Sequence, residues 1–432
     1  MKLKSWSWCL AVAFALVGVR AEAAKFSFSD TGFIDIGSLV QAQYRAEQDA
    51  APSGKDPSND FLLRRARIIM SGQFDEHIGF FFDTDISYGT VSTAISAAAN
   101  TPPGGVATGW NFNMYVLDAV AIYKVNRSFI IDAGLTLLPY SHNSLTNPAT
   151  LSGINSTFAG TAGPYWAPNN NRGFRDVGVV IRGLLLDDRL YYRIGVFNGV
   201  NGLKNTAPAG AVSNGLNPGD APNFAGMLRF NIAGKEEGYG FCQMCFASSP
   251  IISIGVAADV QPQSFRGVTP VGPTTAGVPT GMINWTNYNA DIFADVPFGN
   301  DMEISLDALG QIVKAGDNTP QSGWSINAVL AWRIGPISPY GQIEYFNSDS
   351  QYVGFTKVGA GATTAFTSGD FITYRGGLVW YAHKHNYKIS AEVAFQDRQN
   401  AGVTTSVGTP AAAIGTVPFN HWTGTLQFQA YF

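Results

Sequence analysis

The sequence predicts an all-β protein, a transmembrane antiparallel β-barrel of about sixteen strands. From residue 31 onward, runs of about 10 to 14 residues alternate between apolar and polar side chains. Polar connections rich in Gly, Asn, Pro and Ser separate these runs. The last run, from His421 to Phe432, alternates strictly and ends on an aromatic residue, as the terminal strand of an outer-membrane barrel does. Such alternation places apolar side chains in lipid and polar ones in a lumen.

The alternation locates the expected strands and the connections between them. The strands are expected at 31–45, 65–74, 80–86, 115–125, 128–137, 176–187, 189–198, 223–233, 250–261, 283–296, 301–313, 322–334, 337–348, 369–382, 386–398 and 417–432. Tight connections at 75–77, 126–127, 187–188, 298–300 and 335–336 predict periplasmic turns. Longer connections at 46–59, 90–111, 199–222, 263–281, 350–368 and 399–416 predict extracellular loops.

The first 23 residues have the pattern of a secretory signal peptide. Lys2 and Lys4 precede an apolar run over 6–19, and the small-residue pattern at 21–23 follows it. Cys9 lies inside the apolar run, which is a poor position for the acylated residue of a lipoprotein. We therefore expect cleavage near Ala23 and a single barrel domain over 24–432, in the outer membrane of a Gram-negative bacterium.

The composition excludes several other classes. After the signal no segment approaches the roughly 20 apolar residues of a membrane helix. Abundant Gly and aromatic residues, with only 13% charged residues, suit a membrane barrel. Without residues 1–23 the chain has 24 basic and 30 acidic residues, so no basic field for nucleic acid is expected. A secreted β-sandwich would not explain the aromatic residues expected on the apolar face near strand ends, which are Tyr123, Tyr192, Tyr345, Trp332 and Trp380.

Residues with possible redox or metal chemistry are few. Cys242 and Cys245 form a C-x-x-C pair in an oxidising compartment, which predicts a local disulfide at a periplasmic turn. Phe246 follows, so the histidine of a c-type haem site is missing. His383 and His385 are expected to be solvated turn residues. We expect no cofactor, no metal and no enzymatic activity.

Charges on the polar face of each strand should point into the lumen, because Arg or Lys facing mid-bilayer costs about 2 to 4 kcal/mol. The candidate pore-lining residues are Arg65, Arg67, Asp83, Asp85, Asp118, Arg172, Arg175, Arg182, Arg193, Arg229, Asp291, Asp307, Arg333 and Arg375. Further acidic residues expected on the lumen face of their strands are Asp35, Asp132, Asp259, Glu303, Glu344 and Glu392. These charges could orient solutes by their field, or they could pair with one another and keep the wall rigid.

Three stretches resemble the phosphate-selective porin O and P family of outer-membrane channels. They are 61–67 with 71–74, 118–121 through 133–134 to 139–141, and 175–179 through 183–192 to 195–199. The resemblance implies a sixteen-stranded, trimeric porin in which a long third extracellular loop, here 138–175, folds into the lumen. The chain departs from the family at 135–138, which reads Leu-Thr-Leu-Leu where members often place Arg and Lys, and the loop has no lysine. The chain therefore lacks the basic residues that phosphate selectivity would be expected to need.

The function expected from these observations is passive diffusion of small hydrophilic solutes and ions across the outer membrane, with lipid around the barrel and a homotrimeric assembly. An anion- or phosphate-selective porin is the nearer alternative. A barrel that sheathes a multihaem cytochrome in electron transfer is a second, and a barrel enzyme is the weakest. Loop 138–175 has no acidic residue and is expected to face a wall with Arg65, Arg67 and Arg193. Removing Arg65 and Arg67 should then shift selectivity toward cations.

Overall fold

In the computed structural model of the chain, the described residues are 24–51, 55–86, 114–155, 174–199, 217, 220–271, 275–299, 301–314, 322–348, 353–358, 362–367, 371–398, 404–406 and 420–432. The segment expected to be a signal peptide, Arg172 and much of loop 138–175 lie outside them. Of the helices in this part of the chain, none has the length and apolar character needed to cross a membrane.

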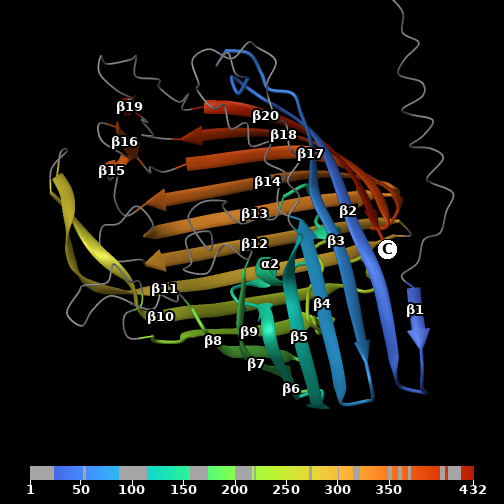
Figure 1. Ribbon diagram of the computed structural model, residues 1–432. Coiled ribbons are helices and arrows are strands. Elements are labelled where there is room, and N and C mark those ends of the chain that lie inside the picture. The colour runs from blue at the N-terminus through green and yellow to red at the C-terminus, as the bar shows by residue number, and fades with distance from the viewer. Residues whose placement is uncertain are drawn as a thin grey trace, which may run out of the picture.

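Sixteen antiparallel strands close into one barrel, as the alternation predicted (Figure 1). Each strand pairs with the next along the chain, and β2 closes the circle by pairing with β20, for example through Leu39 and Tyr431. The strands are β2 (Phe33–Glu47), β3 (Asp60–Gln73), β4 (Ile78–Ile86), β5 (Met114–Asn126), β6 (Phe129–Leu137), β7 (Arg175–Leu185), β8 (Leu190–Phe197), β9 (Asn223–Ala233), β10 (Ile251–Val271), β11 (Thr275–Phe298), β12 (Met302–Lys314), β13 (Gly323–Ile334), β14 (Ile337–Ser348), β17 (Phe371–His383), β18 (Tyr387–Arg398) and β20 (Asn420–Tyr431).

A short N-terminal strand, β1 (Ala24–Ser27), continues the wall past the end of β20. β20 pairs with β2 from Glu47 down to Leu39, and the main-chain groups of Ser38 and Phe432 exchange two hydrogen bonds. β1 then pairs with 33–36 of the same strand. The start of the described chain and its C-terminus therefore meet at one end of the barrel, where the tight turns also lie.

Three predicted loops contain strands instead. β10 and β11 remain paired beyond their neighbours, from Phe265 opposite Ile283 to Val271 opposite Thr275, so 263–281 is a projecting hairpin. The connections expected at 350–368 and 399–416 contain β15 (Val353–Val358), β16 (Ala362–Thr367) and β19 (Thr404–Ser406), which form a separate small sheet (Figure 1). The prediction was wrong here because Val- and Thr-rich connections have the same strand propensity as the wall.

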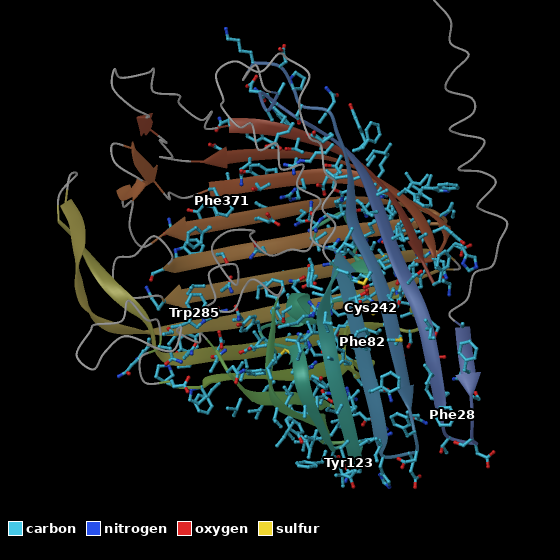
Figure 2. All side chains as sticks on the ribbon, viewed as in Figure 1. Phe28, Phe82, Tyr123, Cys242, Trp285 and Phe371 are labelled. Atoms are coloured by element: carbon cyan, nitrogen blue, oxygen red, sulfur yellow. A yellow bond between two sulfur atoms is a disulfide. The ribbon has the colours of Figure 1, made fainter. Side chains whose placement is uncertain are left out.

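The two faces of the wall differ as a membrane barrel requires. On β13, Leu330 and Trp332 are about half exposed on the outside, whereas Ser325 and Asn327 are buried on the inside. Tyr123, Trp332 and Trp380 are exposed apolar-face aromatics, as predicted. Figure 2 shows Tyr123 at the lower rim of the barrel, where a membrane interface would meet it.

Two connections fold inward and contact the wall from inside. The first follows β6 and contains α2 (His142–Leu145) and the 3-10 turn η2 (Pro148–Thr150). Ser141 caps α2 by accepting the main-chain N–H of Ser144, and all four helical residues are buried. The second is the connection between β9 and β10, in which Phe241, Gln243 and Met244 are buried. Figure 1 shows α2 within the ring of strands.

Candidate functional site

A cavity of about 240 Å³ lies inside the barrel between the wall and the segment that follows β6. β2, β3, β17, β18 and β20 supply its wall, and Ile154 and Asn155 supply the opposite side. Apart from Ile154 and Ala394 its lining is polar, and the charged side chains in it are all arginines. The lining residues are Gln43, Arg45, Arg64, Ile154, Asn155, Thr373, Arg375, Ala394, Gln396, Thr423 and Thr425.

Arg64 reaches this cavity because β3 contains a bulge. Arg65 pairs with Gln41 on β2 and Leu63 pairs with Ala42, so Arg64 is the extra residue between them. Arg65 also points inward, where it donates to Gln41 Oε1 at 2.6 Å. A bulge lets two consecutive side chains share one face. The sequence analysis expected this strand to begin at Arg65, so it did not consider Arg64.

Arg45 and Arg375 present guanidinium groups to the same cavity. Arg45 pairs with Glu47 at 2.5 Å, and Arg375 contacts Glu392 at 3.3 Å and Glu344 at 3.5 Å. Glu392 also accepts from the hydroxyl of Tyr340 at 2.7 Å. The Nε–H groups of Arg45 and Arg375 are buried without a hydrogen-bond partner among the described residues. Each of these two arginines therefore keeps one strong donor that no described residue accepts.

Most of the predicted pore-lining charges point inward but are buried in ion pairs. Arg67 bonds Asp83 at 3.0 Å and Asp85 at 2.9 Å, and Arg333 bonds Glu303 at 2.8 Å. Arg175 bonds Asp118 at 2.8 Å, Arg182 bonds Asp132 at 2.6 Å, and Arg229 bonds Asp291 at 2.5 Å. These pairs join neighbouring or nearby strands, where opposite charges on one face meet.

Of the predicted arginine wall, none of the three members lines the cavity. Arg193 is fully buried and donates to the main-chain oxygen of Tyr239 at 2.8 Å. Arg65 and Arg67 are each 8% exposed. Their burial favours the alternative in which these arginines keep the wall rigid and do not act on solutes. Of the predicted pore-lining residues, Arg375 lines the cavity.

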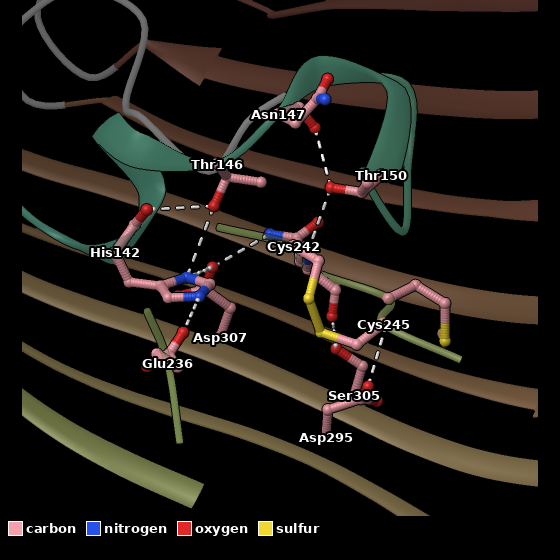
Figure 3. Close-up of a disulfide and its surroundings, with 12 residues drawn as sticks. His142, Thr146, Asn147, Thr150, Glu236, Cys242, Cys245, Asp295, Ser305 and Asp307 are labelled. Atoms are coloured by element: carbon pink, nitrogen blue, oxygen red, sulfur yellow. Dashed lines mark hydrogen bonds and ion pairs between the residues drawn. A yellow bond between two sulfur atoms is a disulfide. The ribbon is translucent and has the colours of Figure 1, made fainter. Parts of the chain in front are cut away.

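His142, on α2, lies at the centre of a second cluster that the sequence reasoning did not single out. Its ring contacts Glu236 Oε1 at 2.8 Å through Nε2 and Asp307 Oδ2 at 2.9 Å through Nδ1 (Figure 3). Phe293 and Phe241 stack on the imidazole, with centroids 4.0 Å and 5.4 Å away.

The charges of this cluster set the protonation of His142. Burial opposes the charged ring, but the nearby carboxylates of Glu236 and Asp307 outweigh it and raise the pKa of His142 to about 9. Burial also opposes ionisation of Glu236, but Arg229 and His142 outweigh it and lower the pKa of that carboxyl to about 2. The pair is therefore ionised at neutral pH.

Cys242 and Cys245 are joined by a disulfide within the β9–β10 connection, half-buried beside this cluster (Figure 3). The sequence analysis expected the pair at a periplasmic turn, but the connection folds back into the barrel instead of turning tightly. His385, expected to be solvated, is covered by the same segment, and its Nε2 lies 2.6 Å from the main-chain oxygen of Met244. Burial and nearby Lys388 lower the pKa of His385 to about 3.

Among the described residues, no three His, Cys, Asp or Glu side chains are grouped so as to hold a metal ion. The cavity instead offers guanidinium, amide and hydroxyl groups. These can hydrogen-bond a passing solute or ion, and the carboxylates paired with Arg45 and Arg375 do not line the cavity.

Comparison with known proteins identifies the fold. No protein-family model matches the chain, and no curated protein matches it. An anion-selective porin from Comamonas acidovorans superposes with a TM-score of 0.51 at 13% identity, covering 92% of this chain and 99% of that one. The outer membrane channel DcaP of Acinetobacter baumannii gives 0.50 at 10% identity, covering 95% and 100%. The fold is therefore that of an outer-membrane porin.

No comparison supports the sheath for a multihaem cytochrome. The two inward segments are a separate argument against this alternative. They contact the wall from β9 to β18 and occupy space in the lumen that a cytochrome would need.

Proposed function

We propose that the chain is an outer-membrane porin through which small hydrophilic solutes and ions diffuse passively. The observation that carries this is the polar, arginine-lined cavity inside a closed barrel whose outer face is apolar. A water-filled path with weak, exchangeable contacts lets solutes enter and leave without tight binding. No catalytic step forms part of this proposal.

A preference for anions is the more specific candidate. The lining of the cavity includes three arginines and no carboxylate, and the acids behind Arg375 are engaged by it. A positive wall raises the local anion concentration and lowers that of cations. The superposed porin from Comamonas acidovorans is named as anion-selective, which agrees with this direction.

Three finer features rest on the sequence. We infer that residues 1–23 are a signal peptide, that the barrel assembles as a homotrimer in lipid, and that its relatives are the phosphate-selective porin O and P family. The resemblance at 175–199 supports the last two. Phosphate specificity is not proposed, because loop 138–175 contains no lysine.

Planar-bilayer recording and liposome swelling with the purified wild-type protein test the function. We expect a stable ohmic conductance, entry of neutral sugars at rates that fall with size, and a reversal potential toward the anion side in a salt gradient. Folded, heat-modifiable protein that neither conducts nor admits sugars would refute diffusion. A reversal potential on the cation side would refute only the anion preference.

A further inference from the structure

The connection between β9 and β10 differs from the other connections at its end of the barrel. Residues 74–77, 127–128, 186–189 and 335–336 turn within a few residues, whereas 234–250 spans seventeen. The wall does not require this length, because β9 and β10 stay paired down to Ala233 opposite Ile252. A short turn would close the hairpin equally well.

This connection is bonded to the segment that enters from the other end. The main-chain N–H of Phe241 donates to Leu145 at 2.8 Å, and Asn147 donates back to Phe241 at 2.9 Å. Farther along, Met244 donates to Thr150 at 3.0 Å. The side chain of Gln243 accepts from the N–H of Ser152 at 2.9 Å. The two segments thus form one body inside the barrel.

The body is fixed to one continuous part of the wall, from β11 to β18. On the β11 side, the N–H of Cys245 donates to Asp295 at 2.9 Å. Met244 packs with Val329, Tyr340 and Tyr381, which come from β13, β14 and β17. On the neighbouring strand β18, Lys388 Nζ donates to the main-chain oxygen of Leu151 at 2.7 Å. Ile154 and Asn155, a few residues on, border the arginine-lined cavity.

We propose that residues 235–249 are a second constriction segment, which enters the lumen from the periplasmic end and holds residues 142–155 against the cavity lined by Arg45, Arg64 and Arg375. The inference rests on the proposed function, since it names what limits solute size in that channel. His142 is the positioning residue that locks the body, because it joins the first segment to Glu236 of the second and to Asp307 of the wall.

The contacts that hold His142 in place depend on its charge. The charged groups around His142 are Glu236 of the connection, Asp307 of β12, Asp291 of β11 and Arg229 of β9. With His142 protonated, two cations face three carboxylates. When the ring loses its proton, Arg229 alone faces all three, and the carboxylates repel one another in a buried site.

The pKa of His142 determines how the stability of the body changes with pH. The pKa of His142 in the folded protein, about 9, lies above its ordinary value of 6.5. The stabilisation is therefore complete below about pH 6.5 and is lost as the pH rises through about 9. Conductance of the wild type should rise over the same interval as the body loosens.

The direct test replaces 234–250 by Asn-Gly in the full chain and compares single-channel conductance and liposome swelling with the wild type. We expect conductance to rise by roughly twofold or more, and swelling to extend to larger sugars, because a lumen obstruction is removed. A heat-modifiable variant with wild-type conductance and size limit would overturn the proposal. A wild type that does not conduct would instead refute the proposed function.

A matched pair of substitutions keeps the proposal testable if the shortened chain does not assemble. Glu236 contacts His142 and is buried, whereas Glu237 is about half exposed and pairs with Arg127 at the rim. Glu236→Gln should move the alkaline rise in conductance down by about one pH unit or more, because His142 loses a carboxylate partner. Glu237→Gln should keep the wild-type profile. Identical profiles for both variants would show that His142 does not lock the body.

Discussion

Arg64→Ala is the most informative substitution for the proposed anion preference, because the bulge alone brings Arg64 to the cavity. An ion at the centre of a cavity of 240 Å³ lies about 6 Å from charges in its lining. At that distance one unit charge is worth about 0.7 kcal/mol in water, and screening at 0.1 M salt reduces this to about 0.4 kcal/mol. The local anion concentration should then fall about twofold while that of cations rises by the same factor.

The expected result is a fall of about fourfold in the anion-to-cation permeability ratio, measured from reversal potentials in a salt gradient near 0.1 M. The shift should nearly vanish at 1 M salt, where the screening length is about 3 Å. Arg64→Lys retains the charge and should keep the wild-type ratio. Arg127→Ala removes an exposed rim charge and controls for net charge. An unchanged ratio for Arg64→Ala at low salt would refute the assignment of selectivity to this cavity.

Three further predictions concern the buried pairs and the disulfide. Arg67→Met combined with Asp83→Asn and Asp85→Asn replaces a paired cluster by neutral residues, so reversal potentials should stay at the wild-type value; a shift toward cations, as the sequence analysis expected on removing Arg65 and Arg67, would show that Arg67 acts on the pore. Arg229→Ala leaves Asp291 buried without its cation and Glu236 with His142 alone, and it should destabilise the protein by about 3 to 5 kcal/mol, seen as a lower temperature of heat modification; an unchanged temperature would contradict the burial. Cys242 and Cys245 should resist alkylation in denatured protein until a reductant is added, and mass spectrometry that finds two free thiols without reductant would disprove the bond.

The sequence alone determined the wall of this protein. Alternation in a strand has a fixed period of two, so it assigned Leu330 and Trp332 to the outside and Asn327 to the inside without knowledge of any contact. The alternation of short and long connections gave the direction of each strand. The sequence also placed Arg67 and Asp83 on the inner faces of neighbouring strands, although it left open whether they pair.

Only the tertiary structure decided the interior. A bulge shifts the phase of β3 by one residue, and nothing in the local pattern marks Arg64 as the extra residue. His142, Glu236 and Asp307 meet from positions up to 165 residues apart, and each alone reads as an ordinary polar residue of a connection or strand. The segment 234–250 lacks the alternation of a strand, and its burial depends on partners at 145–152 that enter from the opposite end. Periodicity reports which face a side chain takes, but not what lies across the lumen from it.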